Sequence, residues 1–148
     1  MSKQLPRDKG CFVCGKDNPF GLKLHFNIED EHTVSAKFTP AEHLIGFKGM
    51  LHGGIMSAVL DDALCWAIYN STGKFYVTSQ LNVNFKKPGS MKGEFTVVGR
   101  AIRSDEKRSR KVEHAKAELK DASGHIVADA EGTFFQIPDH KVKELWDY

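Results

Sequence analysis

The sequence predicts an α+β domain in which one antiparallel sheet wraps round a single long helix. The segment from Gly53 to about Ser71 is apolar almost all round, as expected of a helix buried on every side. Segments on both sides of it alternate apolar and polar residues with the period of two that strands have. Strands that are segregated from one helix favour α+β, and any face of the helix left open calls for a second subunit.

The bulk composition is that of one globular domain covering residues 1–148. Hydrophobic residues make up 41% and charged residues 27%, which is ordinary for a packed core. A net charge of +2 argues against a dedicated nucleic-acid binder. No apolar run approaches the roughly 20 residues needed to span a bilayer, and residues 1–10 lack an apolar signal core. We therefore expect a cytoplasmic protein with no membrane or nucleic-acid partner.

Two strands are expected before the helix. Residues 1–21 form a leader and then an ordered loop, because 11–21 is dense in turn formers. Apolar and polar residues alternate over 22–28, and a shorter strand is expected over 34–38. Residues 40–51 are expected to form a loop with a short helical turn.

Four strands are expected after the helix, for which Gly73 is a plausible C-terminal stop. A turn at residues 121–124 separates the last two strands. The predicted strands cover residues 77–85, 94–103, 110–120 and 125–137. A terminal helical turn is expected over 141–148.

Two adjacent acids interrupt the apolar helix. Asp61 and Asp62 are its only charged residues between Gly53 and Tyr69. Burying a carboxylate without partners costs several kcal/mol, so acids in this position need a reason. One reason is catalysis, and the other is that an Asp caps a neighbouring loop or pairs with a structural Lys or Arg.

The start of the helix is a candidate site for a developing negative charge. His52, Gly53 and Gly54 lie where backbone N–H groups are unpaired and the helix dipole is positive. A carbonyl oxygen placed there would be polarised, although the glycines could instead serve only a tight loop-to-helix turn. Asp61 lies about two turns, or ~10 Å, inside the helix. Across a two-fold interface, Asp61 of one subunit could face the helix start of the other.

The residues from Leu51 to Asp62, with His-Gly-Gly and then Asp-Asp, resemble the signature of hotdog-fold acyl-CoA thioesterases of the phenylacetic-acid-degradation type. Residues 77–88 resemble the strand that follows the helix in that subfamily. Residues 11–22 are similar to a leader of many bacterial members. The resemblance covers about residues 11–137. It implies a hotdog fold with five to six antiparallel strands round a central helix, assembled as a homodimer or as a homotetramer built from two dimers.

The resemblance also implies a role for each matching residue. Asp61 matches the acid that acts as general base or nucleophile on the thioester. Gly53, with Gly54 beside it, matches the backbone N–H that polarises the thioester carbonyl. His52 matches a histidine that orients the site or contacts the thioester region, and Thr78 matches a Ser/Thr position that helps to place the attacking water.

Two positions depart from the family pattern. Gly46 falls where some members have an Asn that helps to orient the site. Asp62 adds a second acid, so that either Asp61 or Asp62 could be the base. The function implied is hydrolysis of an acyl-CoA thioester to a carboxylic acid and free coenzyme A, with no cofactor and no metal. The alternative is an acyl-CoA binding or sensing protein without turnover.

A local basic cluster is a candidate for binding the coenzyme A phosphates. Arg108, Arg110 and Lys111 lie at a predicted strand junction, with Arg103 and Lys107 nearby. The alternative is a solvated hairpin end, which is the usual meaning of a run of charges.

The N-terminal loop carries a Cys-x-x-Cys pair, Cys11 and Cys14. Zinc would need about two more ligands, and the histidines His25, His32 and His43 provide no second pair with zinc-like spacing. An odd total of three cysteines fits reduced thiols better than a disulfide framework. We therefore expect loop cysteines and no metal.

Overall fold

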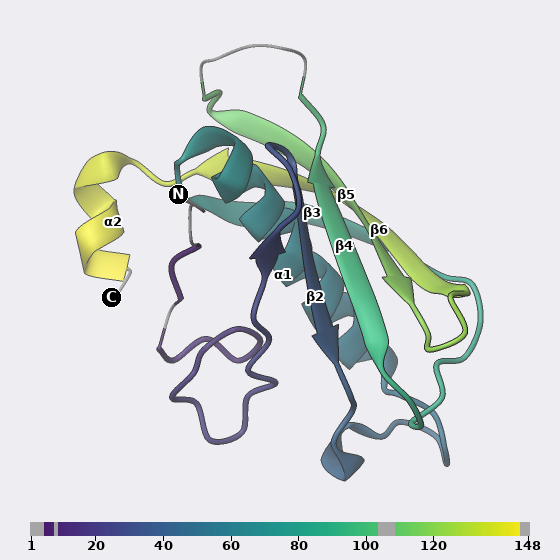
Figure 1. The fold of residues 1–148 in the computed structure, drawn as a ribbon. Coiled ribbons are helices and arrows are strands. Elements are labelled where there is room, and N and C mark those ends of the chain that lie inside the picture. Colours follow the sequence, from purple (N-terminus) through teal and green to yellow (C-terminus); the bar gives the residue numbers. More distant parts are fainter. Residues whose placement is uncertain (1–4, 8, 104–108, 146–148) are drawn as a thin grey trace.

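The computed structural model describes residues 5–7, 9–103 and 109–145 and confirms the α+β fold, with one sheet wrapped on one long helix (Figure 1). All pairings between neighbouring strands are antiparallel, and the strand order is β1-β2-β4-β5-β6-β3. The elements in chain order are β1 (Asn27–Ile28), β2 (Thr33–Phe38), the short 3-10 helix η1 (Glu42–Leu44), α1 (Gly53–Thr72), β3 (Tyr76–Phe85), β4 (Phe95–Ala101), β5 (Val112–Lys120), β6 (Ile126–Gln136) and α2 (Asp139–Leu145).

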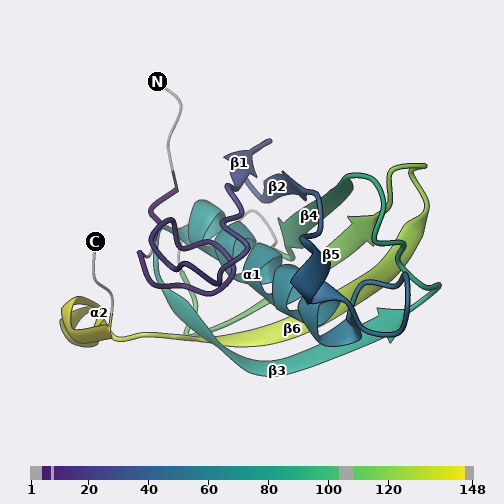
Figure 2. The same ribbon diagram turned by 90° about the horizontal axis from the view of Figure 1, so that it is seen from below.

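The sheet curves round α1, which lies on its concave side (Figure 2). The helix residues Val59, Leu60 and Leu64 are completely buried, as the apolar pattern predicts. The contact with β4 is closest at Gly99, where an added Cβ would lie 2.4 Å from the backbone oxygen of Ala63. Only glycine permits this approach, so Gly99 fixes how deeply α1 lies in the sheet.

The ends of α1 follow their local sequence. His52 is the N-cap residue, with φ −61° and ψ 132°, just outside the first helical residue Gly53. Gly73 ends the helix with φ 72°, and its N–H donates to the Tyr69 carbonyl at 2.7 Å. A left-handed glycine after the last turn is a common helix stop because it satisfies a carbonyl there at no steric cost.

Strand β3 lies at one edge of the sheet and pairs with β6 only. Among the described residues no strand pairs with its other side. Two large apolar side chains on β3 are half exposed: Val77 at 50% and Phe85 at 54%. An exposed edge that carries apolar side chains is a place where another strand can pair.

The strand predicted over residues 22–28 is wrong in extent, because β1 contains only Asn27 and Ile28. Leu24 and Phe26 are buried, which produces the alternating pattern. Their segment packs on the N-terminal loop instead of the sheet, since the Leu24 N–H donates to the Val13 carbonyl at 2.9 Å. Lys23 has a φ of 55°, which interrupts the extended backbone.

The other predicted elements are confirmed with shifts at their ends, where backbone pairing runs out before the sequence pattern does. The expected helical turn before α1 is η1. The expected terminal helix is α2, which begins at Asp139, and residues 146–148 lie outside the described part of the chain. No helix in that described part is long and apolar enough to cross a bilayer.

Candidate active site

A pocket of about 770 Å³ opens beside the start of α1. His52 and Gly53 line it, together with Phe85 from the end of β3. Its other lining residues come from the loop before α1, from the helix and from the segment after β3: Ile45, Gly46, Phe47, Met50, Leu51, Met56, Lys86, Lys87 and Pro88. This volume and this mainly apolar lining are typical of a small-molecule site.

The His52 side chain caps the helix that begins beside it. Its Nδ1 accepts a hydrogen bond of 2.8 Å from the Gly54 N–H. In the neutral ring the proton therefore lies on Nε2, which can act as a donor. Gly53 is the first helical residue, where the backbone N–H has no helical acceptor. The predicted trio of His52, Gly53 and Gly54 is thus a helix start with Gly53 facing a pocket.

Gly46 lies directly against His52. A Cβ added to Gly46 would lie 3.1 Å from the His52 Cα and 3.6 Å from its Cδ2. Any side chain at position 46 would therefore contact the histidine. Because Gly46 has no side chain that could bind His52, the His52 ring is held by its hydrogen bond from the Gly54 N–H.

Two of the predicted site residues, Asp61 and Thr78, are in direct contact. The Thr78 hydroxyl donates to Asp61 Oδ1 at 2.7 Å, joining the middle of α1 to the early part of β3. Burial raises the pKa of Asp61, and the Thr78 hydrogen bond opposes part of that rise. Asp61 is half-buried, so its carboxylate is accessible as well as desolvated. These properties suit a general base.

Asp62 has different surroundings on the neighbouring side of α1. Its Oδ2 accepts from the Trp66 indole N–H at 3.2 Å, and its Oδ1 lies 3.9 Å from Cys11 Sγ in the N-terminal loop. Burial, with a further contribution from Cys11, raises the pKa of Asp62 to about 8. Asp61 has a hydroxyl partner on β3, whereas Asp62 has Trp66 on α1 and Cys11 in the loop as its partners. The two adjacent acids are therefore not equivalent.

Within one chain, Asp61 does not lie at the pocket. It is eight residues beyond Gly53, or about 12 Å along the helix axis, and it is not among the lining residues. Asp61 and Gly53 also lie beside opposite ends of β3. Gly53 adjoins Phe85, whose Cε1 would be 3.4 Å from an added Cβ, whereas Thr78 lies near the start of the strand.

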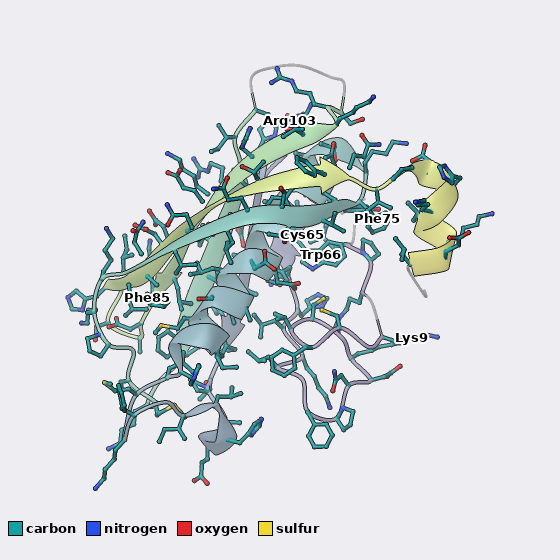
Figure 3. The ribbon with its side chains drawn as sticks, turned by 180° about the vertical axis from the view of Figure 1, so that it is seen from behind. Lys9, Cys65, Trp66, Phe75, Phe85 and Arg103 are labelled. Carbon is teal, nitrogen blue, oxygen red and sulfur yellow. The ribbon has the colours of Figure 1, made fainter. Side chains whose placement is uncertain are left out.

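The predicted basic cluster is only partly described. Arg108 lies outside the described residues. Arg110 and Lys111 are exposed just before β5, and the Arg110 carbonyl accepts from the Tyr76 hydroxyl at 2.6 Å. Arg110 thus lies beside the start of β3, whereas the pocket lies beside Phe85 at its end. Figure 3 shows Arg103, which shares Glu113 with Arg110, at the end of the molecule away from Phe85.

The apolar residues that line the pocket were not predicted as site residues from the sequence. Phe85 and Met56 looked like ordinary core residues, and Ile45, Phe47 and Met50 belong to a loop without periodicity. One signal was available: the apolar residues Ile45 and Phe47 stand close together in a loop, and a contiguous exposed apolar patch often marks a binding site. Their exposed fractions are 45% and 81%.

Comparison with known sequences finds one family model, described as the thioesterase superfamily, which matches residues 48–113. This stretch contains α1 with both acids and the whole of β3 and β4. The chain is also similar to acyl-coenzyme A thioesterase THEM4 of Bos taurus, with 38% identity over 78 residues. That match covers 52% of this chain and 31% of THEM4. The chain thus spans about a third of the length of the curated relatives it matches.

Solved structures share the fold. The PaaI protein from the phenylacetic acid degradation operon of E. coli has a TM-score of 0.70 at 18% identity, covering 79% of this chain and 81% of PaaI. A hypothetical thioesterase from Streptococcus pneumoniae, solved with coenzyme A, has a TM-score of 0.68 at 18% identity, covering 77% and 85%. The sheet topology, the central helix and these solved structures show that the chain has the hotdog fold, and its residues 48–113 match the thioesterase superfamily.

Proposed function

We propose that this protein is an acyl-CoA thioesterase that hydrolyses the thioester to a carboxylic acid and free coenzyme A. The observation that carries the proposal is the Asp61–Thr78 hydrogen bond, which holds a desolvated carboxylate on a helix whose start faces an apolar pocket. The similarity to a THEM4 acyl-coenzyme A thioesterase supports thioester hydrolysis, and the coenzyme A in the pneumococcal structure supports the ligand.

The active site requires two subunits. Antiparallel pairing of two β3 edges about a two-fold axis sets the Tyr76 end of one strand against the Phe85 end of the other. Since Asp61 is bonded to Thr78 near one end and Gly53 adjoins Phe85 at the other, this pairing brings Asp61 toward Gly53 of the partner subunit. The exposed apolar side chains on β3 support this interface.

The same pairing accounts for the position of the basic residues. Arg110 is tied to Tyr76, so the Tyr76 end of β3 carries Arg110 and Lys111 toward the partner's pocket. There their charges can bind the coenzyme A phosphates. The acyl group would lie in the apolar pocket against Phe85 and Met56.

Each group then has one chemical task. The Asp61 carboxylate removes a proton from water, and the resulting hydroxide attacks the thioester carbon. The Gly53 N–H of the partner subunit stabilises the negative charge on the carbonyl oxygen. The carbon–sulfur bond breaks as the carbonyl re-forms, and the coenzyme A thiolate leaves with the proton that Asp61 had taken. Thr78 keeps Asp61 Oδ1 oriented, which leaves Oδ2 for the water.

The second candidate is an acyl-CoA binding or sensing protein without turnover. Gly46 favours it, because the position against His52 carries no polar side chain to orient a substrate. The two functions share the pocket and the basic residues. They differ only in whether Asp61 acts on water.

A thiol-release assay on the full chain tests the proposal, using a panel of short, long and aryl acyl-CoAs with binding measured in parallel by calorimetry. We expect release of free thiol from at least one substrate at a rate well above the uncatalysed reaction. Tight binding of several acyl-CoAs with no thiol release would contradict hydrolysis and favour the sensor.

A further inference from the structure

The N-terminal loop and α1 meet at a group of three metal-binding side chains, which we call the cysteine–aspartate cluster: Cys11, Cys14 and Asp62. One ligand atom of each lies within 4.8 Å of the others. Cys11 and Asp62 are 51 residues apart in the sequence, so the cluster exists only because the loop folds back on the helix. Figure 2 shows this loop lying alongside α1.

The loop holds its two cysteines in a fixed turn. The Cys14 N–H points at Cys11 Sγ with an N to S distance of 3.4 Å, and the Gly15 N–H donates to the Cys11 carbonyl at 2.8 Å. An added Cβ at Gly15 would lie 2.4 Å from that carbonyl oxygen, so the turn requires glycine. An N–H directed at a cysteine sulfur stabilises the negative thiolate, which is the form that binds metal.

The carboxylate is also oriented from behind. Trp66 is 3% exposed, and its indole N–H donates to Asp62 Oδ2 at 3.2 Å. This leaves Oδ1 on the side of Cys11 Sγ, at 3.9 Å. A buried donor that fixes one oxygen of a ligand carboxylate is a common outer-shell feature of metal sites. In Figure 3, Trp66 lies on the side of α1 next to this loop.

The distance between Cys11 and Asp62 fits a tetrahedral ion. With Zn–S near 2.3 Å and Zn–O near 2.1 Å, a thiolate sulfur and a carboxylate oxygen on one zinc lie about 3.6 Å apart. The observed distance of 3.9 Å between Cys11 Sγ and Asp62 Oδ1 differs by a few tenths of an ångström. Two thiolates select zinc over magnesium or calcium, which prefer ligand sets made only of oxygen.

We propose that Cys11, Cys14 and Asp62 bind one Zn²⁺ that fastens the N-terminal loop to α1, with solvent as the fourth ligand. The sequence alone provides two of the four ligands that zinc needs, Cys11 and Cys14, and the fold adds Asp62 as a third ligand. The ion would occupy Asp62 and leave Asp61 as the acid available to the substrate. This site is separate from the proposed thioester chemistry, because Asp62 lies beside Cys11 of the N-terminal loop, whereas Asp61 is bonded to Thr78 on β3.

Metal content tests the proposal without reference to turnover. The full chain, purified reduced and without chelator, should contain one equivalent of zinc by elemental analysis. After removal of the metal, titration with Co²⁺ under reducing conditions should give thiolate-to-cobalt charge-transfer absorption that saturates at one equivalent. Addition of zinc should then bleach it.

Variants assign the ligands. C11S, C14S and D62N should each weaken zinc binding by more than about 100-fold, since loss of an outer-shell partner alone costs 10–100-fold. W66F should fall within that smaller range. The matched control is C65S, because Cys65 donates to the Tyr76 carbonyl and lies outside the cluster. D62N still tests the site if a cysteine variant fails to fold, because the Asn side-chain carbonyl can accept the hydrogen bond from the Trp66 indole N–H.

Two results would overturn the site. One is a reduced, folded chain that binds neither zinc nor cobalt, or binds them equally well in D62N and in the cysteine variants. The other is an intact mass two hydrogens lower, with a Cys11–Cys14 disulfide peptide and no bound metal. Neither result depends on hydrolysis of acyl-CoA, so failure of this proposal is distinguishable from failure of the proposed function.

Discussion

The Thr78 hydroxyl donates a 2.7 Å hydrogen bond to the carboxylate of Asp61, across the interface between β3 and α1. The bond places the acid on the side of the helix that faces the exposed edge of the sheet. Asp62, one residue later, is bonded to Trp66 and lies beside Cys11. The contrast between these two carboxylates predicts which one acts on the substrate.

Asp61→Asn should abolish most turnover, and Asp62→Asn should not. Loss of a general base costs about 10²–10⁴-fold in rate, so D61N should lose that much in kcat while it remains folded. D62N should stay within about tenfold of wild type, because Asp62 is held by Trp66 and lies beside Cys11, whereas the bond to Thr78 on the edge strand belongs to Asp61. Steady-state thiol release with size-exclusion chromatography as the folding control measures both. Equal loss in the two variants would refute the assignment.

Thr78→Val should move the acidic limb of the pH–rate profile. Burial already raises the pKa of Asp61, and the Thr78 hydrogen bond lowers it. A base works only when ionised, so activity is present above its pKa and falls as the pH drops through it. Removing the hydroxyl raises this pKa further and shifts the limb to higher pH. Thr78→Ser keeps the hydroxyl and should keep the wild-type limb. A limb unmoved in T78V would show that another group titrates.

Gly53→Pro removes one N–H and little else. Proline is tolerated at the first helical position, and His52 already has the extended φ and ψ that a residue before proline needs. We expect kcat to fall by about 10²–10³-fold, the usual effect of losing one oxyanion donor. Gly53→Ala is the control, because it keeps the N–H and its Cβ would meet Phe85 at an ordinary 3.4 Å. If G53P and G53A lose activity equally, the N–H has no role.

Glu113→Ala should destabilise the fold. Glu113 pairs with Arg103 Nε at 3.5 Å with side chains only 3% and 4% exposed, and it also accepts from the Arg110 N–H at 3.1 Å. Removing one partner of a buried pair costs about 3–5 kcal/mol. The exposed pair of Lys116 and Glu131 gives the control, since K116A should cost about 0–1 kcal/mol. Urea unfolding compares them, and a loss in E113A no larger than in K116A would contradict the account.

Much of the fold was predictable because its signals are periodic. The apolar run from Gly53 gave the position of α1, and the alternation before Pro88 gave β3. Roles for Asp61 and Thr78 were implied only by the family resemblance, and their contact was not expected. The alternating pattern around Leu24 gave a wrong strand prediction. Alternation of apolar and polar residues shows which side chains are buried but not whether the backbone pairs in a sheet, and here the N-terminal loop buries Leu24.

Contacts made by irregular loops were not predicted, because they leave no periodic pattern in the sequence. Cys11 lies beside Asp62, 51 residues later in the chain, because the N-terminal loop packs on α1, and no local sequence pattern indicates that packing. The pocket wall at Ile45 and Phe47 likewise belongs to a loop, which lines the pocket together with Phe85 at the end of β3. Sites assembled from loops and distant segments depend on the fold as a whole.

Subunit complementation tests the shared active site most directly. Gly53→Pro and Asp61→Asn, each inactive alone, are unfolded together and refolded as a mixture. If Asp61 acts with Gly53 of the partner subunit, each mixed dimer regains one intact site. Since half of randomly formed dimers are mixed, turnover should recover to about a quarter of wild type. A mixture that forms dimers but stays as inactive as its components would place both residues in one subunit's site and contradict the account.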